Sequence, residues 1–175
     1  MWAVCACSSW NRPEVLEMLA ELNVGFCNID QPVIGRSIGP SEHSTSPVGY
    51  VRLHGRNYEQ WFTPQERSPN GGERYDYLYS RDELEPWAER IRNIARRADT
   101  TYVIANNHFE GKAVANALEL MSLLTGHAVR VPERLVEHYP ELQPIAAPQS
   151  SGSRPRQTDL LFESPVAGPK TVRDV

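Results

Sequence analysis

The residue types best suited to chemistry in this 175-residue sequence lie at the end of a short, mostly apolar run, Val48 to Leu53, and just after it. Arg52, His54 and Arg56 occupy alternate positions along this predicted strand and its exit. Because side chains alternate between the two faces of a strand, we expect all three to point to the same side. Two guanidinium groups beside an imidazole suit a phosphate, a carboxylate or a developing oxyanion. The alternative is structural, with Arg52 paired to a carboxylate in the protein interior and His54 bonded to backbone.

A second polar cluster, Asn106, Asn107 and His108, follows the apolar run Tyr102 to Ala105. Asparagine amides orient ligands, and histidine acts as a general acid or base near neutral pH. The alternative is a turn in which one asparagine caps the helix that begins near Gly111, since asparagine is a preferred capping residue.

Two further candidates end the first two predicted strands. Asp30 lies where parallel α/β barrels place catalytic acids, or it forms an Asx turn before Pro32. Trp10 either lines a pocket or packs in the core. The predicted catalytic residues are therefore His54, His108 and Asp30, and the predicted substrate-binding residues are Arg52, Arg56, Asn106, Asn107 and Trp10.

Composition narrows the classes of function. A net charge of -4 provides no overall attraction to nucleic acid or to an anionic membrane. No stretch reaches the roughly 20 apolar residues of a membrane span. The three cysteines leave at least one thiol unpaired, which favours a reducing cytoplasm. Aromatic residues between positions 58 and 79 surround Arg56, Arg67 and Arg74, so contact with nucleic acid is a less favoured alternative.

The sequence predicts no cofactor and no metal. It contains no glycine-rich phosphate loop, nucleophile elbow or zinc-protease helix. Cys5, Cys7 and Cys27 lack a fourth ligand of the usual spacing. A set made of two histidines and one carboxylate, His54, His108 and Asp30, is conceivable but is not favoured.

Strand and helix patterns alternate along the chain. Strands are predicted at 2–7, 24–29, 48–53 and 102–105, with long loops at 31–47 and 55–76. Helices are predicted from Asn11, which can cap ahead of Pro13 and Glu14, from the capping box Ser80 to Glu83, and over 111–124. Residues 1–130 form the α/β portion, 131–142 a short extension, and 143–175 a tail rich in proline and serine that we expect to be disordered.

This order predicts a parallel sheet with right-handed crossovers. Long polar loops follow the strands, as in a TIM-like (β/α) barrel, whose active face lies at the carboxyl ends of its strands. Only four strands are predicted where such a barrel has eight, so the fold expected is an incomplete or half barrel. Its open face and unpaired edges lead us to expect that the chain either forms a homodimer that completes a barrel-like assembly or is poorly stable.

Four segments resemble the YecE-like proteins, domain-of-unknown-function family 72. They are Tyr50-Val-Arg-Leu-His-Gly-Arg56, Tyr77-Leu-Tyr-Ser80 with Leu84 and Trp87, Asn106-Asn-His108, and Gly111-Lys-Ala-Val-Ala-Asn-Ala117. The resemblance covers residues 1 to about 125 and matches the family's C-terminal half. It implies a TIM-like barrel whose biochemical function is unknown.

The sequence departs from the family pattern at its start. The family carries an acidic residue and an arginine on the strand before the Ser-Trp pair that aligns with Ser9-Trp10, whereas this chain has Val4-Cys-Ala-Cys7. Two classes of function follow. One is binding or turnover of an anionic small molecule by Arg52, Arg56 and the candidate acids and bases. The other is a non-catalytic interaction module or a truncated, inactive remnant.

Overall fold

A parallel sheet organises the computed structural model, which describes residues 2–3, 7–61 and 73–148. The strands are β1 (Trp2–Ala3), β2 (Gly25–Asp30), β3 (Val48–Leu53) and β4 (Thr100–Ala105). They lie in the order β1-β2-β3-β4, and every neighbouring pair is parallel. The protein is therefore mixed α/β with a parallel sheet, as predicted.

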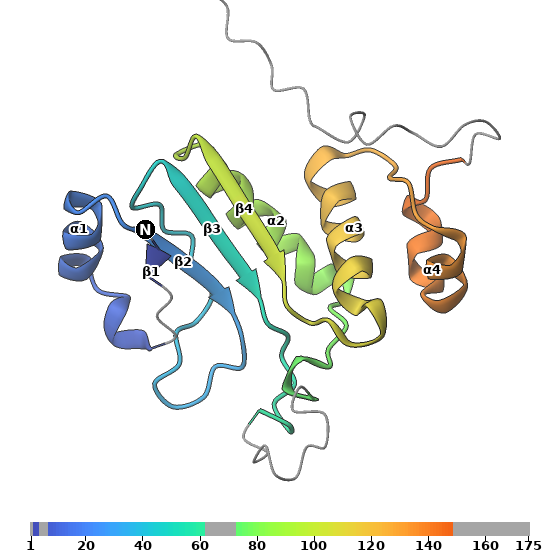
Figure 1. Ribbon diagram of the computed structural model, residues 1–175, viewed down its shortest axis with the longest axis horizontal. Coiled ribbons are helices and arrows are strands. Elements are labelled where there is room, and N and C mark those ends of the chain that lie inside the picture. The colour runs from blue at the N-terminus through green and yellow to red at the C-terminus, as the bar shows by residue number, and fades with distance from the viewer. Residues whose placement is uncertain (1, 4–6, 62–72, 149–175) are drawn as a thin grey trace, which may run out of the picture.

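Three of the four described α-helices pack against this sheet, and the last one packs beyond them at its far end. The helices are α1 (Pro13–Glu21), α2 (Arg81–Ala95), α3 (Lys112–Thr125) and α4 (Glu133–His138), with short 3-10 turns at Ser8–Trp10, Glu73–Tyr75, Phe109–Gly111 and Pro140–Ile145. In Figure 1, α2 lies behind the sheet and α3 lies beside β4, while no labelled helix covers the front of β3 and β4. None of the described helices is long and apolar enough to cross a membrane.

The main core fills the space between the sheet and α2 and α3. Alternate residues of β3 are buried against these helices, including Val51 and Leu53, and the residues between them face the other side. Helix α2 contributes Leu84, Trp87 and Ile91, among other residues, which fits the predicted i, i+3, i+7 spacing. Burial of these side chains fixes the strand ends relative to the helix starts.

Two smaller clusters flank the main core. Leu19, Phe26 and Ile38 pack between α1 and β2. At the other end, α3 packs against the C-terminal segment through a buried group that consists of Ala115, Val129, Val131, Tyr139, Leu142 and Ile145. The tail predicted from residue 143 was therefore placed too early, because Ile145 belongs to this group; residues 149–175 lie outside the described residues.

The connection from β2 to β3 is the long loop that the sequence predicts. No helix occurs between Asp30 and Val48, all of which is described, and hydrogen bonds hold this loop against β2 instead. The Asn28 amide bonds to the backbone of His43 and Tyr50 and to the Ser41 hydroxyl. Hydrogen bonds from buried polar side chains therefore hold this connection against the sheet, whereas other connections are held by the apolar face of a helix.

Helix starts were predicted well in one case and poorly in another. Ser80 and Glu83 form the predicted capping box at the start of α2. At α1, Pro13 begins the helix as predicted, but the cap residue is Arg12 and no side chain caps it. Asn11, the predicted cap, lies 2.7 Å from His43 through its Oδ1 and the histidine Nε2.

Candidate functional site

The predicted polar residues gather at the carboxyl ends of β2, β3 and β4, but they form two separate groups. Strand β3 ends at Leu53, and Gly55 adopts φ +91, so the alternation expected to align Arg52, His54 and Arg56 does not extend to Arg56. A Cβ at Gly55 would lie 2.7 Å from the Tyr77 Cβ, which makes glycine necessary at this turn. Arg52 and Arg56 consequently meet different partners.

The first group is an ion-pair network around Arg56. Its Nε and Nη2 donate to the two carboxylate oxygens of Asp30, each at 2.9 Å. Its Nη1 donates to Glu83 Oε1 at 3.1 Å, and the Tyr77 hydroxyl donates to the same oxygen at 2.6 Å. Asp30 is only 1% exposed. This network joins the end of β2 to the start of α2.

The electrostatics of this group favour its charged form. Burial alone would lower the pKa of Arg56, but its hydrogen bonds to Asp30 and the two nearby carboxylates outweigh burial and raise it. Burial opposes ionisation of Glu83, but hydrogen bonds from Tyr77 and Ser80 and the charge of Arg56 lower its pKa. Burial, together with the hydrogen bond to Glu83, raises the pKa of Tyr77. The arginine therefore has two committed counter-ions.

The second group begins with Arg52 and Asn106, which come from neighbouring strands. Arg52 donates from Nε and Nη2 to Asn106 Oδ1, at 3.3 and 3.1 Å. Arg52 is opposite Ile104 in the register of β3 and β4, so Asn106 lies just beyond the pair. Within the described residues, no carboxylate approaches Arg52 to ion-pair distance. Its guanidinium is therefore held by a neutral acceptor.

His54 lies among aromatic rings next to this arginine. Its ring centroid is 5.6 Å from that of Tyr75 and 6.5 Å from that of Trp61. Its Nδ1 is buried and has no hydrogen-bond partner within the described part of the chain. Burial, and then the charge of Arg52, lower the pKa of His54 to about 4, against the opposing charge of Asp30. At neutral pH this imidazole is uncharged.

His108 completes the second group from the end of β4. Its ring centroid is 5.8 Å from that of Tyr75. Its Nδ1 is 3.0 Å from the Asn106 carbonyl oxygen. A carbonyl only accepts hydrogen bonds, so Nδ1 of this exposed side chain is the donor, and in the neutral ring Nε2 carries the lone pair. The term "Arg52 group" denotes Arg52, His54, Trp61, Tyr75, Asn106 and His108 below.

Asn107 and Asn116 have structural roles. The Asn107 amide donates to Tyr77 O and to Asn116 Oδ1, at 2.8 and 2.7 Å. Asn116 accepts from Tyr79 N and donates to Tyr79 O, so it braces the neighbouring loop. Neither asparagine of the 106–107 pair caps a helix, because the cap position of α3 is Gly111, in the left-handed region.

Trp10 packs against the cluster of Leu19, Phe26 and Ile38. Sequence reasoning did not place Glu83 at the site, although its capping role was recognised. It considered Trp61 and Tyr75 only as members of the aromatic cluster that was a candidate for contact with nucleic acid, and not beside His54. Val4 to Ala6 belong to the predicted strand that lacks the family's acidic residue and arginine. They lie outside the described residues.

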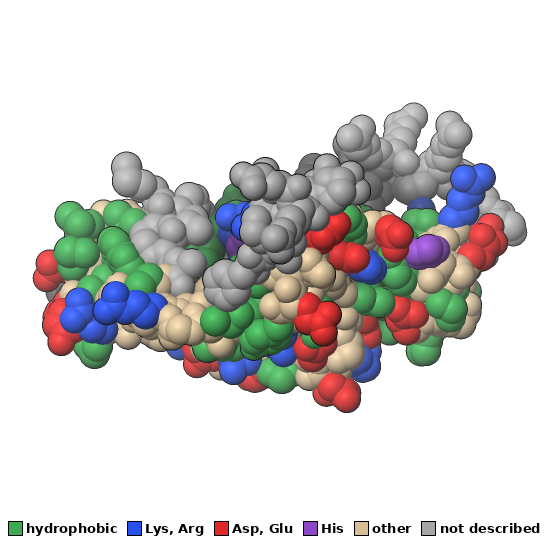
Figure 2. All heavy atoms as spheres, turned by 90° about the horizontal axis from the view of Figure 1, so that it is seen from below, with side chains coloured by type: hydrophobic (Ala, Val, Ile, Leu, Met, Phe, Trp, Pro, Cys, Tyr) green, Lys and Arg blue, Asp and Glu red, His purple; other side chains and the backbone are tan. Residues whose placement is uncertain are grey.

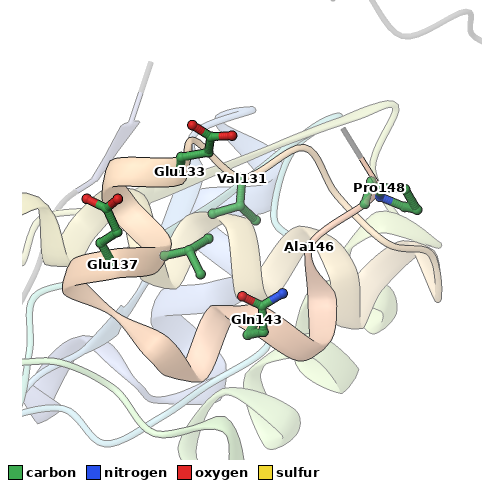
Figure 3. Close-up of a pocket in the computed structure, with 8 residues that line it drawn as sticks. Val131, Glu133, Glu137, Gln143, Ala146 and Pro148 are labelled. Atoms are coloured by element: carbon green, nitrogen blue, oxygen red, sulfur yellow. The ribbon is translucent and has the colours of Figure 1, made fainter. Parts of the chain in front are cut away.

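Elsewhere the described residues offer no metal centre, and the view in Figure 2 shows no large face of a single charge among them. No three His, Cys, Asp or Glu side chains of the described residues are placed to hold a metal ion. Figure 2 views the molecule from the end to which the strands point, and acidic, basic and apolar side chains are interspersed there. A hollow of about 530 Å³ lies away from the strand ends, between α4 and the turn at Pro140–Ile145 (Figure 3). Glu133 and Glu137 lie beside it.

The fold and the polar strand ends define a parallel α/β protein with a candidate site at the carboxyl edge of its sheet. A family model described as "Protein of unknown function DUF72" matches residues 7–141. The chain belongs to this family, of which YecE-like is another name, and the predicted resemblance is confirmed.

Individual relatives and solved structures match parts of this chain in sequence or in fold. UPF0759 protein YunF of Bacillus subtilis is 31% identical over 97 residues, which are 54% of this chain and 34% of that protein. A DUF72 family protein from Thermotoga maritima has a structure that matches with TM-score 0.63 and 33% identity, over 70% of this chain and 45% of that one. One from Enterococcus faecalis matches with TM-score 0.60 and 24% identity, over 73% and 46%. The chain thus spans less than half the length of these relatives.

Proposed function

We propose that the Arg52 group binds a small molecule that carries an anionic group such as a phosphate. The observation that carries this proposal is the pairing of Arg52 with a neutral oxygen, Asn106 Oδ1, while no carboxylate of the described residues neutralises it. A guanidinium fork without a counter-ion suits a phosphate or carboxylate oxygen pair.

Arg56 and Asp30 are not part of the proposed binding group. Arg56 already donates to three carboxylate oxygens, and Asp30 accepts with both of its own. An anion at Arg56 would have to displace a buried carboxylate, which is costly. We therefore assign this pair to holding the strand ends and the start of α2 in place.

Turnover of the bound molecule is the second candidate function, and His108 is the observation that favours it. The bond from His108 Nδ1 to the Asn106 carbonyl leaves Nε2 of the neutral ring able to accept a proton, and Asn106 also holds Arg52. His54, whose pKa is about 4, is a weak base at neutral pH and fits a hydrogen-bonding role better. The alternative class, a non-catalytic binding module, needs only the anion site.

We also propose that the sheet is half of a TIM-like barrel. Four parallel strands, helices packed against them and polar residues at the carboxyl ends support this arrangement. In such a barrel Arg52 and His54 belong to the mouth, where substrates of barrel enzymes bind.

The anion proposal predicts a thermal shift that depends on Arg52. The protein would be melted with inorganic phosphate, sulfate, sugar phosphates and nucleotides. A ligand at 100 times its dissociation constant stabilises the folded state by about 2.7 kcal/mol, which is measurable. We expect Arg52→Ala to abolish the shift, and Asn106→Asp to abolish it as well, because the new carboxylate would neutralise Arg52.

The matched control is Arg96→Ala, which removes an arginine whose side chain is 66% exposed at the end of α2. It should leave the shift unchanged. The proposal is wrong if no anion moves the melting temperature, or if a shift persists undiminished in Arg52→Ala and Asn106→Asp.

A further inference from the structure

Strand β4 carries apolar side chains on both of its faces although it lies at the edge of the described sheet. On the face without helices, Tyr102 is 52% exposed and Ile104 39% exposed. On the other face, Val103 and Ala105 point towards the helices. Parallel strands with apolar residues on both faces are usually interior strands, covered on both sides.

Helix α3 extends this apolar surface beyond the edge of the sheet. Val114, Ala117 and Met121 are all exposed and recur at i, i+3 and i+7, so they form a stripe along the helix. A hollow of about 180 Å³ lies between α3 and β4, and it is lined mainly by apolar residues: Leu53, Val103, Ala105, Asn116, Ala117, Leu120, Met121 and Leu124. Of the eight large hydrophobic residues that are exposed in the described chain, four lie on β4 and α3.

The edge strands of the described sheet each pair with a neighbour on one side only. Among the described strands β4 pairs only with β3, and β1 at the opposite edge pairs only with β2. Each edge therefore presents N–H and C=O groups that suit a further parallel strand. An edge that is long, apolar and uncharged is a site for pairing with another chain.

We infer that a second copy of this chain covers this surface, with β4 of each copy beside β1 of the other. A two-fold axis along the barrel would bring both pairs of edges together at once. Four strands from each copy make eight, the number that closes a parallel (β/α) barrel. The matched part of this chain covers 45% of the solved Thermotoga maritima relative.

In this assembly the open face with Tyr102 and Ile104 becomes the barrel interior. The α3 stripe and its hollow then receive side chains from the neighbouring copy. This inference rests on the half-barrel part of the proposal and not on the anion site, because sedimentation measures the assembly whether or not any anion binds. Failure of one proposal can therefore be told from failure of the other.

Sedimentation velocity of the full chain from about 1 to 100 µM tests the inference. We expect a species of twice the 19.8 kDa mass of one chain, with a cooperative thermal melt. Ile104→Glu and, separately, Met121→Glu should shift the population to the monomer, because each places a charge in the contact. Val33→Glu is the matched control: Val33 is 51% exposed on the loop after β2, away from β4 and α3, and its substitution should leave the dimer intact.

Circular dichroism would establish that each variant is folded before its mass is interpreted. A folded monomer at every concentration would overturn the inference. So would a dimer that neither Ile104→Glu nor Met121→Glu weakens, or a chain that associates only with a different polypeptide.

Discussion

At the scale of single residues, His54 couples the candidate site to pH. Burial and the nearby charge of Arg52 lower its pKa from 6.5 to about 4. Between these two values the unfolded chain holds a proton at this position that the folded chain lacks. The stability of the folded state therefore rises with pH across this window, and is lost as pH falls through it.

We predict that His54 is half-protonated near pH 4 in an NMR titration of its ring resonances. The free energy of unfolding, measured in urea between pH 4 and 6.5, should rise with pH. In His54→Phe, which keeps an aromatic ring beside Tyr75 and Trp61 without a titrating group, this rise should be smaller. A ring that titrates near 6.5, or equal slopes in the two proteins, would contradict the prediction.

Arg52 and Arg56 show how far residue types alone can lead. Their spacing predicted one shared anion site, and both do lie at the carboxyl end of β3. Their roles differ because of partners distant in the sequence: Asp30 and Glu83 hold Arg56, whereas Asn106 holds Arg52. Local sequence does not specify which of two arginines will meet a buried carboxylate, so the difference could not be predicted.

At the scale of elements, strong periodicity was the reliable signal. Strand β3 has the predicted bounds, Val48–Leu53, and α2 begins after its predicted capping box. The connection from β2 to β3 was predicted as a loop, but the means by which it packs was not. Buried polar side chains hold it, Asn28 and Thr45 among them, and isolated polar residues of this kind give no periodic signal.

We predict that Asn28→Ala destabilises the protein by more than the loss of packing from one small side chain would. The Asn28 side chain is fully buried and makes hydrogen bonds to Ser41, Tyr50 and both backbone groups of His43. Each buried group left unsatisfied costs about 1–3 kcal/mol, so urea unfolding should show a loss of at least about 2 kcal/mol. Asn11→Ala is the control, because Asn11 also contacts His43 but is exposed. Similar losses in both variants would show that Asn28 does not hold the loop.

At the scale of the whole molecule, the packed structure extends past the part that defines the family. The family model ends at residue 141, yet Leu142 is fully buried and Ile145 is 8% exposed in the cluster against α3. Backbone bonds join this segment to the chain after α3: Val129 N donates to Ile145 O, and Ala147 N to Val129 O. Residues 142–147 therefore complete the cover of α3.

We predict that a chain ending at residue 141 is much less stable than one ending at residue 148. The shorter chain loses two buried aliphatic side chains, each worth about 1.5–3 kcal/mol, and exposes Val129 and Tyr139, which pack with them. Urea unfolding of the two chains should therefore differ by roughly 3 kcal/mol or more. Leu142→Ala in the full chain tests the same contact without truncation and should cost about 2–5 kcal/mol. If both truncated chains unfold at the same urea concentration, the stability of α3 does not depend on residues 142–147. The stable fold would then end at residue 141, where the family model ends.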